Sequence, residues 1–309
     1  MIVTLTINPT IDRVITVDRL AFEDRAYINS THLKAGGRGI NASFVIHSFG
    51  GKTVALLISG GNSGNRVEEL LRGDGLSFEI VPVCNEIRTN LTITDRHGLT
   101  VNLNEKGPEL SRQEVTRVEA AVRDALQHAS WLMICGSLPP GVPSSFYGKL
   151  IALARKKKVS TLLHADGEAL RQGIEERPTV VTPNHREAER LLGRTLLTRT
   201  HYLEAAANIR SMGPEAVVLS LGSRGAVGAF ESGLMEALPP RIDAVCPIGA
   251  GDALSAAYTW SMTHKPDPAV AMRWGVAAGT ASARLPGMQF ATLEQTKEIY
   301  SQVEMRRAD

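Results

Sequence analysis

Hydrophobic and polar positions along this chain follow two different periods, which predict strands and helices in alternation. Short apolar runs bounded by turn residues are typical of buried strands. They occur at residues 2–7, 54–58, 131–135, 159–163, 179–181 and 216–220. Apolar residues three or four positions apart indicate amphipathic helices. Such segments lie near residues 42–49, 67–73, 112–127, 252–264, 268–284 and 292–306. Repeated alternation of strands with helices predicts an α/β fold.

Two stretches break this alternation and predict a second, smaller sheet. Residues 13–35 alternate weakly and carry no helical stripe, and residues 77–104 hold three β-like runs separated by turn residues. We expect these stretches to pair as one sheet at the ligand-binding edge, where such an insertion serves as a lid. Since the chain shows no internal repeat, low-complexity segment or Pro/Gly linker, residues 1–309 are predicted to form a single domain, with lid segments at about 13–35 and 86–104.

Composition and charge narrow the class of protein. Of the 309 residues, 43% are hydrophobic and 21% are charged, which is typical of a globular protein with a sizeable core. Lys and Arg number 34 against 32 Asp and Glu, so no strong field favours nucleic acid or a membrane surface. The three cysteines lack metal-binding spacing, and the chain shows neither a targeting segment nor an apolar run of the roughly 20 residues that span a membrane. We therefore expect a cytoplasmic protein with small-molecule partners.

The stretch Gly249-Ala250-Gly251-Asp252 is the strongest candidate for chemistry. Two glycines around an alanine let consecutive backbone N–H groups turn toward one point, and the following helix places the positive end of its dipole there. This arrangement predicts an anion site. Asp252 would compete with the bound anion unless it has a chemical role, so it is a candidate catalytic group. The alternative is an ordinary dipole partner in the first turn of a helix.

Further candidates follow other predicted strands. Asp12 comes just after the first strand, where open α/β sheets bind ligands. The glycine-dense residues 35–41 let the backbone approach a ligand, and Asn41 can hydrogen-bond a hydroxyl, although a tight loop that needs positive φ gives the same pattern. Arg88 stands at the root of the predicted lid, where its fork could bind a phosphate.

Asn184 and Glu187 have two interpretations. Three positions apart at a helix start, they lie on one face, where an amide and a carboxylate could hold a metal-bound water and a phosphate. The same spacing fits a capping box, with Asn184 as the N-cap. The glycine-rich turn at residues 222–226 suits a nucleotide. Together with the anion site and the lid, these features favour phosphoryl transfer, in which positioning and charge neutralisation dominate.

Four motifs in this order resemble the PfkB (ribokinase-like) family of sugar kinases. Residues 6–12 resemble the family's opening strand with its sugar-binding aspartate, and residues 35–42 and 249–252 resemble its two signatures. Asn184-x-x-Glu187 resembles its N-x-x-E motif. The similarity covers essentially the whole chain.

Additional segments are similar to the hexose-phosphate branch of that family. They are the N-P-x-x-D opening and residues 88–90, 104–108 and 136–141. This branch holds 1-phosphofructokinases, tagatose-6-phosphate kinases and the minor 6-phosphofructokinase. The resemblance implies a three-layer α/β sandwich with a mostly parallel central sheet and a small β-sheet lid, which in this family often doubles as a dimer interface. It also implies ATP and Mg²⁺ as cofactors.

The resemblance also implies a role for each matching residue. Asp252 would accept the proton of the attacking hydroxyl, and the N–H groups of Gly249, Ala250 and Gly251 would stabilise the transferring phosphoryl group. The residues implied to bind sugar hydroxyls are Asp12, Gly36, Gly37 and Asn41. Those implied to hold the phosphate already on the substrate are Arg25, Arg88 and Ser137. Asn184 and Glu187 are implied to organise the ATP phosphates and Mg²⁺. Glu187 would contact the Mg²⁺ through water. Those implied to line the nucleotide site are Ser220, Gly222 and Gly225.

Three positions depart from the family pattern without removing a catalytic group. Arg38 stands where many relatives have lysine, His164 stands where they commonly have aspartate, and Cys246 lies in a segment that is usually richer in Ser and Thr. The leading expectation is an ATP-dependent kinase for fructose 1-phosphate or tagatose 6-phosphate. A kinase for an unphosphorylated sugar or a nucleoside is an alternative. A catalytically silent sugar-phosphate sensor is a third possibility, which the retained Asp252 disfavours.

Overall fold

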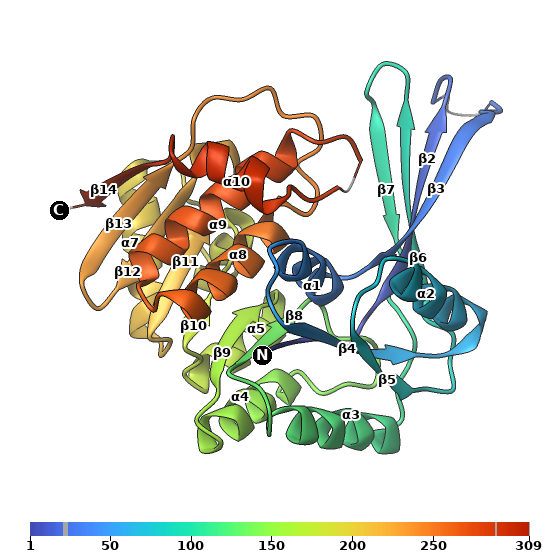
Figure 1. The fold of residues 1–309 in the computed structure, drawn as a ribbon, viewed down its shortest axis with the longest axis horizontal. Helices are drawn as coiled ribbons and strands as arrows, with labels where there is room; N and C mark the ends of the chain where they lie inside the picture. The colour runs from blue at the N-terminus through green and yellow to red at the C-terminus, as the bar shows by residue number, and fades with distance from the viewer. Residues whose placement is uncertain (21–23, 288, 309) are drawn as a thin grey trace.

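A ten-stranded sheet forms the centre of the molecule (Figure 1). The structure is a computed structural model that describes residues 1–20, 24–287 and 289–308. In sheet order, the strands are β14 (Glu304–Ala308), β13 (Gly233–Leu238), β12 (Ala226–Phe230), β11 (Ala216–Ser220), β10 (Val180–Val181), β9 (Ser160–His164), β8 (Trp131–Cys135), β1 (Ile2–Thr6), β4 (Thr53–Ser59) and β5 (Phe78–Pro82). The seven strands from β5 to β11 are parallel, and β12, β13 and β14 are antiparallel. The predicted mostly parallel sheet is confirmed.

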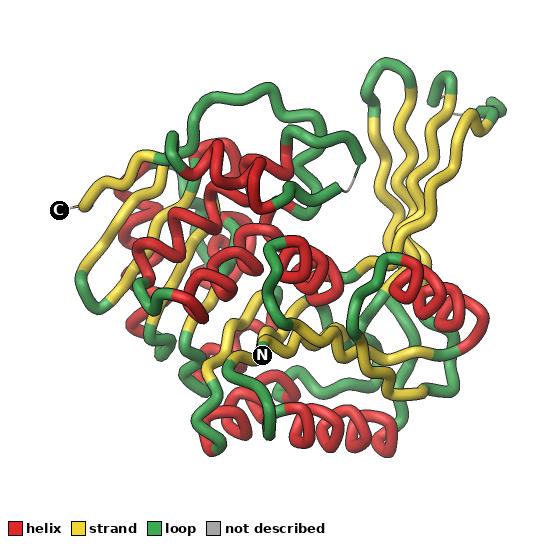
Figure 2. The backbone as a smooth tube through the Cα atoms, in the orientation of Figure 1, coloured by secondary structure: helices red, strands yellow, loops and turns green. Residues whose placement is uncertain are grey.

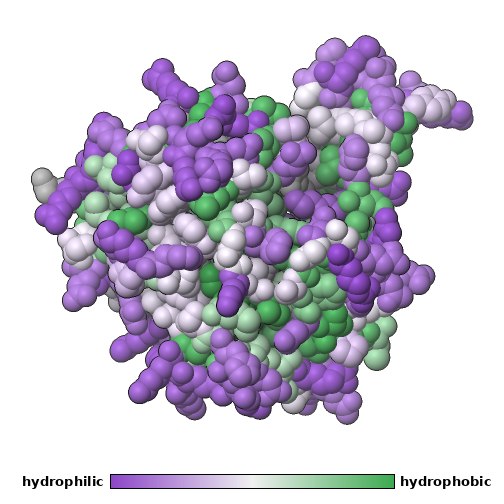
Figure 3. All heavy atoms as spheres, in the orientation of Figure 1, coloured by the Kyte–Doolittle hydropathy of each residue, from purple (hydrophilic) through white to green (hydrophobic). Residues whose placement is uncertain are grey.

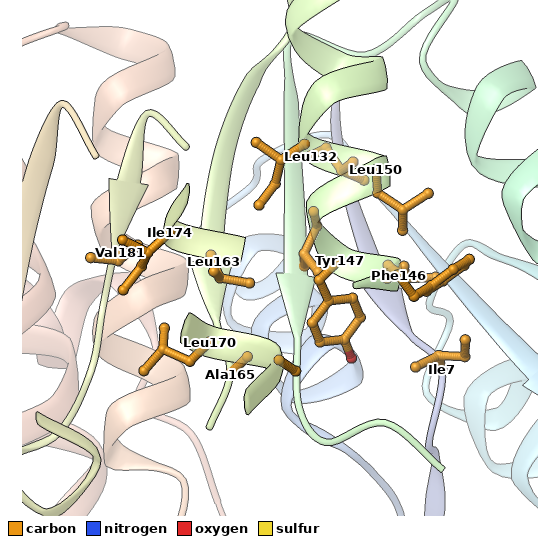
Figure 4. Packing of buried hydrophobic residues seen from close by; sticks show 14 of the residues in the cluster. Ile7, Leu132, Phe146, Tyr147, Leu150, Leu163, Ala165, Leu170, Ile174 and Val181 are labelled. Carbon is orange, nitrogen blue, oxygen red and sulfur yellow. The ribbon is translucent and has the colours of Figure 1, made fainter. Parts of the chain in front are cut away.

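Helices cover both faces of this sheet and complete three layers (Figure 2). The helices are α1 (Arg38–Ser48), α2 (Gly61–Gly73), α3 (Arg112–Ala125), α4 (Phe146–Lys156), α5 (Gly167–Glu175), α6 (His185–Leu192), α7 (Arg199–Ser211), α8 (Ala250–His264), α9 (Pro268–Ala283) and α10 (Leu293–Tyr300). Side chains alternate along β8, so that Leu132 and Ile134 pack with α4 and α5, as Figure 4 shows for Leu132. Trp131 and Met133 pack on the opposite face with α1, α8 and α9.

Four strands form a separate sheet that projects from the body (Figure 1). In sheet order they are β3 (Ile28–Gly36), β2 (Thr10–Val17), β6 (Arg88–Asp95) and β7 (Thr100–Asn104). At the root of this lid sheet, Thr10 pairs with both Gly36 and Arg88. Part of the predicted lid segment, residues 21–23, lies outside the described residues.

The structure differs from the expected elements at both edges of the main sheet. The run at 78–83 was expected in the lid sheet, but β5 pairs with β4 in parallel, because α2 returns the chain beside β4 as a βαβ crossover. The last helix was expected to reach residue 306, but it ends at Tyr300, and β14 follows as an edge strand paired with β13. Helix α7 was not anticipated.

Polar side chains cover most of the face shown in Figure 3. Within the described part of the chain, no helix combines the length and the apolar character that crossing a membrane requires. The three cysteines are unpaired.

Candidate active site

Three helix N-termini converge where the parallel strands end. Asn41 in the first turns of α1 donates from Nδ2 to Oδ2 of Asp252 in the first turn of α8, at 2.8 Å. Arg38, at the start of α1, donates from Nη2 to Oε1 of Glu187 in the first turn of α6, at 2.9 Å. The structure therefore brings together residues from three of the four sequence motifs, which lie up to 211 positions apart.

The turn before α8 has the conformation that the glycine pattern predicts. Gly249 adopts a left-handed φ of 83°, and a Cβ there would lie 2.9 Å from Cε1 of Phe290, so both geometry and space favour glycine. The N–H of Ala250 donates to the carbonyl of Pro247 at 3.2 Å. Among the described residues, the N–H groups of Gly249 and Gly251 have no such backbone acceptor. Two of the three expected donors therefore remain open to an anion.

Asp252 is held at both carboxylate oxygens. The residue is 8% exposed. Oδ2 accepts the hydrogen bond from Asn41, and Oδ1 lies 3.1 Å from Nε2 of His164. Each oxygen keeps a further lone pair, so a ligand hydroxyl can still donate to this carboxylate.

Asp12 lies near the lid root and packs closely against Gly36. It is 7% exposed, and its Oδ1 accepts a hydrogen bond from Nδ2 of Asn90 at 3.2 Å. Burial raises the pKa of Asp12 to about 6, although the Asn90 hydrogen bond and the Arg88 charge oppose this rise. A Cβ at Gly36 would lie 2.0 Å from Oδ2 of Asp12, so glycine is required there. This contact explains one glycine of the motif at 35–41.

Arg88 and Ser137 belong to one hydrogen-bond network at the lid root. Arg88 donates from Nη2 to the carbonyl of Asn8 at 3.0 Å and from Nη1 to the carbonyl of Glu105 at 3.1 Å. Asn8 in turn donates from Nδ2 to Oγ of Ser137 at 3.1 Å. The structure thus places these two predicted phosphate ligands close together.

The structure does not bring Arg25 to this network within one chain. Arg25 is exposed in the connection between β2 and β3, where its N–H donates to Oδ1 of Asp24. That connection follows Val17, which pairs with Ile28 at the end of the lid sheet opposite to Arg88.

Buried polar atoms without partners gather between Asp252 and the lid root. In the described part of the chain, five of them are Asn8 Oδ1, Arg38 Nη1, Asn41 Oδ1, Arg88 Nε and Asn90 Oδ1. Buried polar atoms are rarely left unpaired, so this cluster indicates the place of a polar ligand. Neither Asn8 nor Asn90 was predicted from the sequence to have a role of its own. The signal for Asn90 was its position two residues after Arg88, on the same face of a strand.

Four of the five residues that were expected to bind ATP or Mg²⁺ line one pocket of about 860 Å³, and the buried Glu187 is the exception. The four are Asn184, Ser220, Gly222 and Gly225, next to Ala250 and Gly251. Apolar residues of the 239–247 loop and of α9, including Pro239, Ile242, Val276 and Ala283, complete the wall. This wall was not predicted from the sequence, because scattered apolar side chains of a loop and a helix form no recognisable nucleotide-binding motif.

Asn184 and Glu187 form the capping box that was one of their two interpretations. Oδ1 of Asn184 accepts from the N–H of Glu187, and Oε2 of Glu187 accepts from the N–H of Asn184, both at 2.9 Å. Glu187 is 1% exposed, and its Oε1 accepts from Arg38. Among the described residues, no group of three His, Cys, Asp or Glu side chains could hold a metal directly.

The sequence matches known proteins over nearly its whole length. The pfkB family carbohydrate kinase profile matches residues 2–295. An ATP-dependent 6-phosphofructokinase isozyme 2 of Mycobacterium tuberculosis is 31% identical over 97% of this chain and 88% of its own. A 1-phosphofructokinase of Vibrio cholerae is 24% identical over 98% and 96% of the two chains. A tagatose-6-phosphate kinase of Staphylococcus epidermidis is 26% identical over 99% of both.

A solved structure shares the architecture described above. Phosphofructokinase-2 from Escherichia coli superposes with a TM-score of 0.92 at 28% identity, covering 97% of this chain and 98% of that chain. The family that the ordered motifs predicted is thereby confirmed. The chain belongs to the pfkB family of carbohydrate kinases.

Proposed function

We propose that this carbohydrate kinase transfers the γ-phosphoryl group of ATP to a ketohexose phosphate by direct in-line displacement, with fructose 1-phosphate and tagatose 6-phosphate as the leading substrates. One observation carries the proposal. The unpartnered polar atoms extend from Asn41, beside Asp252, to Arg88 at the lid root. A ligand with hydroxyls along its length and a phosphate at its far end would satisfy them. The three relatives support this choice, since each is named for a phosphorylated ketohexose.

The proposed reaction centre is the first turn of α8. Asp252 orients the attacking hydroxyl and accepts its proton late, as a loose transition state permits. The open N–H groups of Gly249 and Gly251, together with the α8 dipole, stabilise the charge on the transferring phosphoryl group.

The remaining residues position the two substrates. Asp12 and Asn41 accept hydrogen bonds from sugar hydroxyls. Gly36 and Gly37 let the backbone pack closely against Asp12 and Thr6, which holds Asp12 at the sugar site. Arg88 and Ser137 hold the phosphate already on the substrate. ATP occupies the pocket that contains Asn184, Ser220, Gly222 and Gly225.

The donor set around Glu187 fits a magnesium ion held through water. Both Glu187 oxygens already accept hydrogen bonds, from Arg38 and from the Asn184 N–H. Mg²⁺ usually keeps several waters and binds substrate phosphates rather than a cage of protein ligands. When bound with ATP, Mg²⁺ neutralises phosphate charge. Glu187 would orient its water, and Arg38 would hold Glu187 in place.

An ATP-consumption screen with Mg²⁺ across phosphorylated and free hexoses, pentoses and nucleosides tests the substrate class. We expect the highest kcat/KM with a ketohexose phosphate, and Arg88→Ala should raise the KM for it about 10- to 100-fold, because a charged hydrogen-bond partner is lost. Arg96→Ala, in the exposed turn of the same lid, is the matched control. A preference for a free sugar or nucleoside, with a KM that Arg88→Ala leaves unchanged, would instead favour the alternative kinase.

Asp252→Asn separates a kinase from a sugar-phosphate sensor. We expect this variant to fold and to lose about 10²- to 10⁴-fold in kcat, since the proton acceptor is gone. Asp124→Asn, at an exposed position of α3, should keep full activity. Near-normal turnover of Asp252→Asn would show that Asp252 is not the base. Sugar-phosphate binding without turnover in the wild type would favour the sensor.

We also propose that two copies of the chain pair through their lid sheets. Residues directly opposite one another in a sheet share a face, and one row contains Leu33, Leu91 and Leu103 together with the exposed Arg13. Ile93 and Val101 lie on the same face two positions further along. Leu33 is 40% exposed and Leu103 is 52% exposed. A second lid would cover this apolar face while leaving the face with Asp12 to the ligand.

A further inference from the structure

The buried side chain of His164, at the end of β9, contacts the proposed base Asp252. His164 ends β9 and is 5% exposed. Its Nε2 lies 3.1 Å from Oδ1 of Asp252, and its Nδ1 lies 3.0 Å from the carbonyl oxygen of Thr182. The imidazole therefore connects the end of the strand layer with the first turn of α8.

The neighbours of Nδ1 can only accept a hydrogen bond. The first is the Thr182 carbonyl. The Thr182 hydroxyl lies 3.2 Å from Nδ1 and 2.8 Å from Oγ of Ser255. Ser255 donates its own proton to the carbonyl of Gly251 at 3.0 Å, so the Thr182 hydroxyl must donate to Ser255 and has no proton for Nδ1. Nδ1 therefore carries a proton.

The same reasoning applies to the contact with Asp252. An ionised carboxylate accepts and does not donate, so Nε2 must also carry a proton when Asp252 is in the form that a base requires. The ring can then donate to the Thr182 carbonyl on one side and to Asp252 on the other. Within the part of the chain that the structure describes, Arg38 from α1, Lys34 from β3 and Cys135 from β8 also interact electrostatically with Asp252.

We propose that His164 is a positioning residue, which donates from Nε2 to Oδ1 of Asp252 and, together with Asn41 at Oδ2, fixes the plane of the carboxylate toward the attacking hydroxyl. This inference rests on the proposed role of Asp252 as the base. Without the His164 donor, Asn41 alone would leave the carboxylate free to rotate about its Cβ–Cγ bond. A displacement of about 1 Å in a catalytic group can cost roughly 100-fold in turnover.

Two neutral amides that differ by one methylene group test this role. In His164→Gln, the longer side chain can place its amide N–H near the position of Nε2 and donate to Asp252. In His164→Asn, the shorter amide can donate to the Thr182 carbonyl but does not reach Asp252. We expect His164→Asn to lower kcat about 10- to 100-fold while the KM values for both substrates stay within about 3-fold, and we expect His164→Gln to recover most of the loss.

Equal kcat values in the two variants, or wild-type kcat in His164→Asn, would overturn the proposal. A second test introduces His164→Asn into the Asp252→Asn background, where no further loss is expected, because the carboxylate to be positioned is gone. A further loss of the same size would show a general structural role and would also overturn it.

Thermal unfolding of each variant keeps the test decisive. If His164→Asn does not fold, His164→Gln alone decides: a loss as large as that of Asp252→Asn rejects the proposal, and near-wild-type turnover supports it. Turnover of the single Asp252→Asn variant is a separate readout. Near-normal activity there contradicts the proposed base itself, whatever the result at His164.

Discussion

At the scale of single residues, burial determines the ionisation of Asp12. This carboxyl is 7% exposed, and burial raises its pKa from 3.8 to about 6 against the influence of Asn90 and Arg88. Because the folded value lies above the unfolded one, the native state binds the proton more tightly. Stability attributable to Asp12 is therefore present at acid pH and is lost as the pH rises through about 6.

Asp12→Asn is expected to remove this contribution to the pH dependence of stability. Between pH 4 and 7 the wild type should lose about 2 kcal/mol of unfolding free energy relative to the variant, which has no charge to bury. Urea unfolding of both proteins across this pH range measures the difference. A constant gap between the two proteins would contradict the raised pKa. In parallel, the KM of Asp12→Asn for the sugar phosphate should rise, because a carboxylate acceptor is lost.

Arg38 shows why a single departure from the family pattern matters. Its Nη2 binds Glu187, while its Nη1 is buried without a partner among the described residues. A guanidinium carries donors in a fixed fork, so one side can hold Glu187 while the other remains available to an anion between α1 and α6. A lysine ammonium at this position would be a single point charge and could not present these two sides in the same geometry.

At the scale of elements, α3 is anchored by its capping box. Oε2 of Glu114 accepts from the N–H of Ser111, and Oε1 accepts from the N–H of Cys84, both at 2.7 Å. Burial opposes ionisation of this carboxyl, but the hydrogen bonds from Cys84 and Ser111 outweigh it and lower the pKa of Glu114 to about 2. One side chain thus joins the start of α3 to the segment that follows β5.

Glu114→Gln should lower the unfolding free energy by about 1–3 kcal/mol at pH 7, since charge-assisted hydrogen bonds are lost. The folded pKa lies below the unfolded value of 4.5, so this contribution exists above pH 4.5 and fades as the pH falls toward 2. Chemical denaturation at pH 7 and pH 3.5 should show a smaller gap in acid. Glu231→Gln, exposed in the turn between β12 and β13, is the control, with an expected change below about 0.5 kcal/mol. A gap that does not narrow in acid would contradict the assignment.

At the scale of the whole molecule, the two faces of the lid sheet have different characters. Asp12, Lys34 and Asn90 are opposite one another in adjacent strands and lie on one face. The rows of Leu33 and Leu103 lie on the other face. Apart from Arg13, the residues of these rows on the second face are mostly apolar, and an apolar sheet face favours a cover.

Leu33→Lys combined with Leu103→Lys tests whether a second copy provides that cover. We expect the wild type to be a dimer and the variant a monomer, because two charges would be buried in the interface. Light scattering after size-exclusion chromatography measures the mass. Asn102→Lys, on the polar face of β7, should leave the dimer intact. A monomeric wild type at assay concentrations would contradict lid pairing.

Much of the core could be predicted from local patterns, while the edges of the sheet could not. Buried parallel strands such as β8 and β11 appear as continuous apolar runs, because both of their faces are covered. The position of β5 depends on its hydrogen bonds to β4, and the position of β14 depends on those to β13. In each case the partner strand is a separate segment of the chain. Local periodicity does not indicate which neighbour a strand will pair with, and so β5 was expected in the lid and β14 as helix.

The sequence by itself determined the elements of the core, the glycines that permit close approach and the order of motifs that indicates a carbohydrate kinase. It also singled out Asp252 and Asn41 separately, since each follows a glycine-rich turn. Only the tertiary structure decided that Asn41 and His164 hold the two oxygens of Asp252, and that Asn8 and Asn90 join the lid root. The physical reason is that a hydrogen bond depends on distance and direction in space, and residues 88 or 211 positions apart acquire these only when the sheet and its helices pack.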